Sequence, residues 1–132
     1  MRAGGAILGA GVDLVEPARI KRMIEKWDHA FCERVFLVRE REYCESKAIP
    51  AQHFAGRFAV KEALVKALGT GIGEHATWLD VEVTRNSETG APAVSLSGRA
   101  AKTAERLGVT GMHVSMSHTR NYAVAQVILT GD

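Results

Sequence analysis

The sequence predicts an α+β fold, one domain over residues 1–132 with helices packed on one side of a mainly antiparallel sheet. Three observations lead to this class. Residues 17–27 carry an apolar stripe at helical spacing, residues 78–85 alternate between apolar and polar, and apolar segments at 112–118 and 122–129 close the chain. A length of 132 residues leaves room for a single core of ordinary size.

The first half is expected to begin with a strand and to continue in helices. Residues 6–15 form an apolar run that carries one carboxylate, which is typical of a buried strand. The helix over 17–27 has a proline at its first position, where a missing N–H is tolerated. Residues 30–47 are expected to continue helically. A further helix covers 51–68 and ends at Gly69.

The second half is expected to contain two pairs of strands around one helix. Residues 78–85 read as a half-buried strand, and residues 94–97 read as its short partner. Ser97 is a suitable N-cap for a helix over residues 98–107, which ends at Gly108. The two closing strands then complete the sheet.

Composition limits the class of protein and its location. The chain is 46% hydrophobic and 24% charged, as in ordinary soluble proteins, and no apolar stretch is long enough to span a membrane. The formal net charge of +2 is too small to indicate a nucleic-acid binder by itself. Residues 1–9 lack the features of a signal peptide, and Cys32 and Cys44 are expected to be reduced thiols in the core. We therefore expect a cytoplasmic protein.

Two carboxylates in apolar surroundings form the candidate metal site. Asp13 interrupts the first strand, and Glu62 lies at the edge of the buried face of its helix. Two such groups on different elements suit Mg²⁺, which takes one or two protein carboxylates and completes its shell with water and phosphate oxygens. The alternatives are an Asp13 that caps the following helix and a Glu62 that forms a surface ion pair with Lys66.

Cations on the same helix favour a phosphate-containing ligand. Arg57, Lys61 and Lys66 all come from the helix that carries Glu62. The glycine-rich loop at 69–73 could present backbone N–H groups to a phosphate, although simple termination of the helix explains it equally well.

Two other kinds of site are considered and disfavoured. His118 follows Ser117 at the end of a strand, but neighbours on a strand point to opposite faces and no Gly-x-Ser-x-Gly elbow is present, which argues against a hydrolase. A zinc site could be built from His29, Cys32, Cys44 and His53. These residues lack the short matched spacing of a zinc finger or ribbon, which argues against zinc.

A cationic stripe lies on the first helix. Arg19, Arg22 and Lys26 recur at helical spacing beside the apolar stripe. Such runs are usually solvated surface, but this one also suits an acidic protein partner.

Four blocks of the sequence are similar to one known family. They are Gly11-Val-Asp-Leu-Val-Glu16 with Arg19-Ile20, residues 54–71, residues 86–92 and residues 113–125. In order and spacing they resemble bacterial holo-acyl-carrier-protein synthases, the short 4′-phosphopantetheinyl transferases. The resemblance runs through nearly the whole chain, and residues 27–50 are its least similar part.

The resemblance implies a reaction and an assembly. Such enzymes use Mg²⁺ to transfer the phosphopantetheine arm of coenzyme A to a serine of apo-acyl-carrier protein, which activates the carrier for fatty acid biosynthesis and releases adenosine 3′,5′-bisphosphate. The short members are trimers with sites between subunits, so Arg57 and His118 could serve a neighbour's site.

The resemblance also implies roles for individual residues. Asp13 and Glu62 match the Mg²⁺ ligands, and we expect Glu62 to act as base and Lys66 to stabilise charge on the diphosphate. Arg19 matches a carrier-protein contact, to which helical spacing adds Arg22 and Lys26. The positions expected to contact coenzyme A are Arg57, Lys66, Gly69, Thr70, Gly71, Pro92, Ser117, His118 and Thr119.

Two rival classes stay open at this point. One is a different enzyme that binds coenzyme A or a nucleotide at the same metal site but modifies no carrier protein. The other is a small basic nucleic-acid module, which the eight aromatic residues disfavour because they show no base-stacking pattern.

Overall fold

The computed structural model describes residues 5–27 and 29–132. Residues 1–4, part of the segment judged not to be a signal peptide, lie outside this description. In chain order the elements are β1 (Ala6–Val15), α1 (Pro17–Trp27), α2 (His29–Val35), α3 (Val38–Glu45), α4 (Pro50–Leu68), the short 3₁₀ helix η1 (Trp78–Asp80), β2 (Val81–Arg85), β3 (Pro92–Leu96), α5 (Gly98–Leu107), β4 (Gly111–His118) and β5 (Ala123–Gly131).

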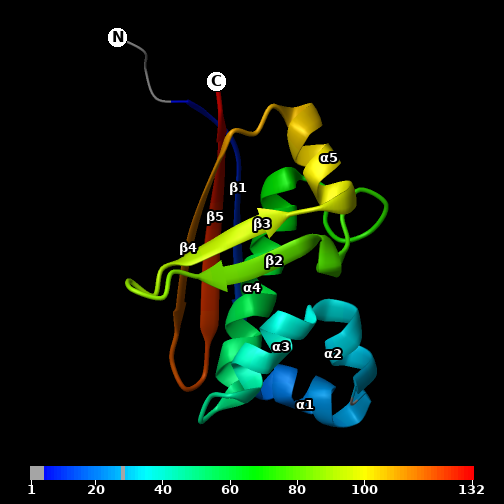
Figure 1. The fold of residues 1–132 in the computed structure, drawn as a ribbon, viewed down its shortest axis with the longest axis vertical. Helices are drawn as coiled ribbons and strands as arrows, with labels where there is room; N and C mark the ends of the chain where they lie inside the picture. Colours follow the sequence, from blue (N-terminus) through cyan, green and yellow to red (C-terminus); the bar gives the residue numbers. More distant parts are fainter. Residues whose placement is uncertain (1–4, 28) are drawn as a thin grey trace.

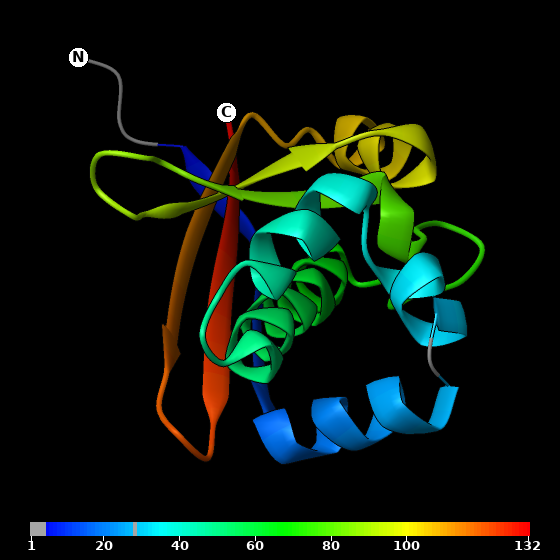
Figure 2. The same cartoon turned by 60° about the horizontal axis from the view of Figure 1, so that its bottom comes forward.

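A three-stranded antiparallel sheet and a β-hairpin enclose one long helix. The sheet has the order β1-β5-β4, and the hairpin pairs β2 with β3. Figures 1 and 2 show α4 in the middle of the fold, with the sheet on one side and the hairpin and the shorter helices around the rest. α4 is accordingly buried over most of its surface. The predicted α+β class is confirmed. No helix among the described residues is long and apolar enough to cross a membrane.

Two glycines in β1 let α4 approach the sheet closely. A Cβ on Gly9 would overlap the backbone oxygen of Ala67, and one on Gly11 would overlap the backbone oxygen of Ala63. The alternation of β1 places Gly11 and Asp13 on the same face of the strand. The glycines therefore bring α4 against the carboxylate of Asp13.

The predicted continuous helix over residues 30–47 is wrong. The chain breaks between α2 and α3, where Phe36 is 1% exposed and belongs to the core. The N–H of Leu37 donates to Oε1 of Glu40 at 2.8 Å, so a glutamate begins the new helix. The sequence shows no glycine or proline at this break.

Three smaller predictions also need correction. Residues 78–80 are helical, so the strand expected over 78–85 begins only at Val81. Asp80 takes the capping role expected of Ser97, because Oδ2 of Asp80 accepts the N–H of Ala100 at 3.1 Å. Trp27 was placed on the apolar stripe of α1, but its side chain is 55% exposed.

Candidate functional site

Asp13, Glu62 and Lys66 form the first cluster, which lies between β1 and α4. The ammonium of Lys66 donates to Oδ1 of Asp13 at 2.9 Å and to the backbone oxygen of Val12 at 3.2 Å. The Asp13 side chain is 16% exposed, whereas Lys66 is half exposed. The lysine is thus directed at the aspartate of the neighbouring strand.

The charge state of Glu62 reflects its surroundings. Its pKa is raised above the ordinary value, first because the side chain is partly buried and second because the Asp13 carboxylate is near. The positive charges of Lys66 and Arg19 act in the opposite direction. Two carboxylates that repel each other across a half-buried site are the arrangement that a divalent cation relieves.

The donor set of this cluster is compatible with Mg²⁺. The chain offers two carboxylates, and within residues 5–27 and 29–132 no three His, Cys, Asp or Glu side chains gather in one place. Mg²⁺ needs only one or two protein carboxylates when water and phosphate oxygens supply the remaining ligands.

A second cluster, which we call the basic pocket, lies between α3, α4, β2 and β4. It is an open cavity of about 430 Å³. Its charged and aromatic lining residues are Tyr43, Lys47, His53, Arg57, Arg85 and His118.

Arg57 is the most buried cation of the basic pocket. Its side chain is 4% exposed, and its guanidinium carbon lies 4.1 Å from the ring centre of Tyr43. Among the described residues its Nε has no hydrogen-bond partner. A buried donor without an acceptor is unfavourable by about 1–3 kcal/mol, so Arg57 holds an unsatisfied donor in the wall of the pocket.

Two histidines face each other beside Arg57. The ring centres of His53 and His118 are 5.4 Å apart. The pKa of His53 is lowered, mainly by burial and next by the charges of His118, Arg57, Lys47 and Arg85. The pocket therefore concentrates positive charge, which an anionic ligand would offset.

The two clusters lie on opposite sides of α4. At about 100° per residue, the side chains of Glu62 and Lys66 point about 140–220° away from those of His53 and Arg57. The first pair faces β1, while the second faces the end of β4. The helix itself separates the carboxylate cluster from the basic pocket within one chain.

The structure corrects one sequence-based expectation about α4 and decides between two explanations for the loop that follows it. Lys61 was expected to serve a phosphate, but it is 0% exposed and pairs with Glu40. The N–H groups of Thr70 and Gly71 both donate to the backbone oxygen of Val65, so these amides terminate the helix, which was the alternative explanation for the loop.

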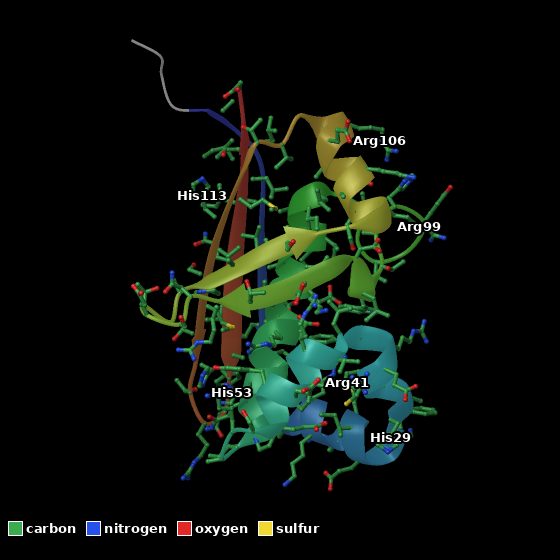
Figure 3. All side chains as sticks on the ribbon, viewed as in Figure 1. His29, Arg41, His53, Arg99, Arg106 and His113 are labelled. Carbon is green, nitrogen blue, oxygen red and sulfur yellow. The ribbon has the colours of Figure 1, made fainter. Side chains whose placement is uncertain are left out.

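The side chains proposed for zinc are not gathered. Figure 3 shows His29 beside α2 and His53 at the N-terminal end of α4. Cys32 and Cys44 are both core residues, as expected. Burial raises the pKa of the Cys44 thiol to about 12, which disfavours the thiolate that zinc requires.

The cationic stripe of α1 is exposed and borders an apolar groove. Arg19, Arg22 and Lys26 are all solvent-accessible. A groove of about 300 Å³ lies beside them, lined by Met23, Trp27, Ala30, Phe31 and Arg34.

The remaining predicted residues lie at the ends of strands. Pro92 begins β3 opposite Arg85. Ser117 lines the basic pocket, and Thr119 lies in the turn that follows, where its N–H donates to the oxygen of Tyr122.

Four residues of the basic pocket were missed from the sequence, namely Tyr43, Lys47, His53 and Arg85. Arg85 is far in the chain from the other three, and no single periodicity connects all four. One local signal was available, because Tyr43 and Lys47 have the four-residue spacing of a helical pair.

Comparison with known proteins gives the class. The 4′-phosphopantetheinyl transferase superfamily matches residues 9–127. A holo-[acyl-carrier-protein] synthase of Syntrophus aciditrophicus is 46% identical over 123 residues, which cover 93% of this chain and 95% of the relative. One of Anaeromyxobacter sp. is 48% identical over 128 residues, covering 95% and 97%.

Solved structures agree with these relatives. A Bacillus anthracis holo-(acyl-carrier-protein) synthase in complex with CoA (3′,5′-ADP) has a TM-score of 0.78 and 36% identity, covering 96% of this chain and 98% of that one. A Helicobacter pylori holo-[acyl-carrier-protein] synthase in complex with coenzyme A has a TM-score of 0.81 and 30% identity, covering 92% and 99%. The fold and these relatives identify the chain as a small α+β transferase. The chain belongs to the 4′-phosphopantetheinyl transferase superfamily, and the resemblance inferred from its motifs is confirmed.

Proposed function

We propose that this chain transfers the 4′-phosphopantetheine arm of coenzyme A to a serine of apo-acyl-carrier protein in an Mg²⁺-dependent reaction. Adenosine 3′,5′-bisphosphate is the other product. One observation carries the proposal: the chain has a carboxylate pair with a lysine and, separately, an open pocket lined by cations. Coenzyme A carries a diphosphate and a separate 3′-phosphate, which require these two kinds of site.

The basic pocket is proposed to hold the nucleotide phosphates. Arg57 brings an unpartnered buried donor, and His118 faces the same cavity. To these predicted residues the pocket adds Lys47 and Arg85 as further cations. The other proposed coenzyme A contacts are Gly69, Thr70, Gly71, Pro92, Ser117 and Thr119.

The carboxylate cluster is proposed to perform the chemistry. Bound Mg²⁺, held by Asp13 and Glu62, would neutralise charge on the diphosphate oxygens. The serine oxygen attacks the β-phosphorus, a new P–O bond forms, and the bond to the bridging oxygen breaks. Glu62 is proposed to take the serine proton through an intervening water. Lys66 stabilises negative charge on the departing nucleotide.

The cationic stripe and the groove beside it are proposed to dock the carrier protein. Acyl carrier proteins are acidic, and opposite charge raises the rate of association. The groove offers apolar area next to Arg22 and Lys26, where a helix of the partner can bury side chains. Arg19 acts on the charge of Glu62, so the stripe reaches the carboxylate cluster.

A homotrimer with sites between subunits is proposed as the active form. The outer face of β1 is apolar and exposed, with Ile7 at 70%, Val12 at 59% and Leu14 at 63%. A patch of this kind marks an interface. A second copy can also bring its basic pocket to the carboxylate cluster of the first, which α4 prevents within one chain. We place this activity in the cytoplasm, in carrier activation for fatty acid biosynthesis.

One assay tests the proposed reaction. The protein is incubated with coenzyme A, Mg²⁺ and apo-carrier protein, and the carrier is weighed by mass spectrometry. A gain of about 340 Da is expected, which is the mass of the transferred arm. A carrier with its acceptor serine replaced by alanine must gain nothing. If coenzyme A is bound but the native carrier also gains nothing, a different coenzyme A-dependent enzyme becomes the better hypothesis.

A further inference from the structure

Glu40 and Lys61 form an ion pair in the core that the proposed reaction does not use. The ammonium of Lys61 lies 2.7 Å from Oε1 of Glu40. Lys61 is 0% exposed and Glu40 is 2% exposed. Desolvation of two charges usually offsets most of their attraction, so apolar residues of similar size would stabilise the fold about as well. The pair therefore calls for an explanation other than stability.

Together the two side chains make three hydrogen bonds to the backbone of other elements. Lys61 donates to the backbone oxygens of Trp78 at 3.0 Å and Val81 at 2.7 Å, in addition to Glu40. Oε2 of Glu40 accepts the N–H of Val83 at 2.8 Å. The three ammonium hydrogens and both carboxylate oxygens thus have partners.

These bonds substitute for a missing strand beside β2. Groups two residues apart on a strand point to the same edge, so the oxygen of Val81 and the N–H of Val83 share the edge away from β3. Lys61 supplies the donor and Glu40 the acceptor that a third strand would otherwise provide. The pair consequently fixes the register between β2, α3 and α4.

The same three elements form walls of the basic pocket. Tyr43 follows Glu40 by three residues on α3, and Arg57 precedes Lys61 by four residues on α4. Arg85 follows Val83 by two residues on β2 and lies on the same face of that strand. The guanidinium carbons of Arg57 and Arg85 lie 4.1 Å and 5.7 Å from the ring centre of Tyr43. Each of these three pocket residues therefore lies about one helical turn, or two strand residues, from a residue that is part of the ion pair or bonded to it.

We propose that Glu40 and Lys61 are positioning residues of the basic pocket. They set the spacing of its cations and so its affinity for a phosphate-bearing nucleotide, while the carboxylate cluster on the other side of α4 is left unchanged. This inference rests on the proposed function, because it assumes that the pocket holds the nucleotide of coenzyme A.

The test compares the buried ion pair of Glu40 and Lys61 with an exposed ion pair nearby. The double variant Glu40→Gln with Lys61→Met removes both charges and keeps the volumes. The control variant Arg39→Met with Glu82→Gln removes the adjacent pair between α3 and β2, in which Nε of Arg39 lies 2.8 Å from Glu82 and Arg39 is 77% exposed. Binding of adenosine 3′,5′-bisphosphate is measured by calorimetry, and KM for coenzyme A and kcat are measured in the transfer assay.

The double variant is expected to bind the nucleotide at least tenfold more weakly and to raise KM by a similar factor, with kcat changed less than threefold. The control should change each quantity less than twofold, because exposed pairs contribute little. If the double variant does not fold, Glu40→Gln alone carries the test, with nucleotide binding at least threefold weaker than in the unaltered protein.

The outcomes separate the two proposals. Failure of the unaltered protein to bind the nucleotide would overturn the proposed function itself. Binding by the unaltered protein, together with equal binding by the folded double variant, would overturn the positioning role. A lower kcat at unchanged affinity would overturn it as well.

Discussion

Lys66 and Asp13 are joined by a hydrogen bond of 2.9 Å although they are 53 residues apart in the chain. The bond connects α4 to β1 at the point where glycines let the two elements meet. It keeps a positive charge beside two carboxylates, one of which, Glu62, has a raised pKa. A site built in this way can bind a cation through its acids and a diphosphate through its lysine.

Removing either acid should abolish transfer and leave the fold intact. Asp13→Asn and Glu62→Gln are each expected to lower kcat at least about 100-fold, because charge that develops on the diphosphate loses its counterion. Asp13→Asn should change the free energy of unfolding by no more than about 1 kcal/mol, since Lys66 is half exposed. The mass-spectrometric assay and thermal unfolding measure these quantities. Glu88→Gln is the exposed control, and full activity in both acid variants would remove the metal assignment.

Adding one methyl group at Gly11 should separate the halves of the carboxylate cluster. Gly11→Ala places a Cβ against the backbone oxygen of Ala63, so α4 must move away from β1. Overpacking of this kind destabilises by about 1–3 kcal/mol, and the displaced Glu62 should lose activity as well. Chemical denaturation and the transfer assay measure the two effects. Ala10→Ser, on the exposed face of the same strand, serves as control; an equal loss in both would point to a general defect of β1.

The stability of the protein should fall as the pH is lowered, partly because of His53. Its pKa is lowered in the folded chain, so the unfolded chain takes up the proton first. The stability contributed by the neutral ring is present above about pH 6.5 and is lost as the pH falls toward the lowered pKa. His53→Phe should therefore reduce the change in melting temperature between pH 8 and pH 5. The exposed His75→Asn should leave that change as it is in the unaltered protein. Parallel curves for all three proteins would contradict the assignment.

Reversing charge on α1 should slow capture of the carrier protein. The double variant Arg22→Glu with Lys26→Glu is expected to weaken the apparent affinity about tenfold at low salt, mainly through the association rate. The difference should shrink as salt screens the exposed charges. Stopped-flow or surface-binding kinetics measure the rate, and Lys102→Glu on α5 is the control for reversal of a surface charge elsewhere. A loss that does not depend on salt would argue against electrostatic docking.

Local patterns were sufficient for the elements whose ends carry a signal. The strand over 6–15 and the helix over 17–27 have the predicted bounds, and Gly69 and Gly108 both adopt a φ of 80° beyond the helices that they end. Glycine and proline report on the backbone directly, so these boundaries can be read from the sequence.

Helix boundaries that depend on contacts with distant parts of the chain could not be predicted from the sequence. The end of α2 is set by burial of Phe36, and the start of α3 is set by Glu40, which looks like one surface charge among many. The same limit explains the site. Asp13 and Glu62 stood out because they interrupt apolar runs, while Tyr43 and Arg85 meet only through the packing of α3 on β2.

The separation of the carboxylate cluster from the basic pocket by α4 has a consequence for mixtures of variants. If each active site takes its carboxylates from one copy and its basic pocket from the next, two variants that are inactive alone can complement each other. Asp13→Asn chains and His118→Ala chains can be mixed in equal amounts, unfolded and refolded together. In trimers that assemble at random, about a quarter of the active sites would then combine an intact carboxylate cluster with an intact basic pocket.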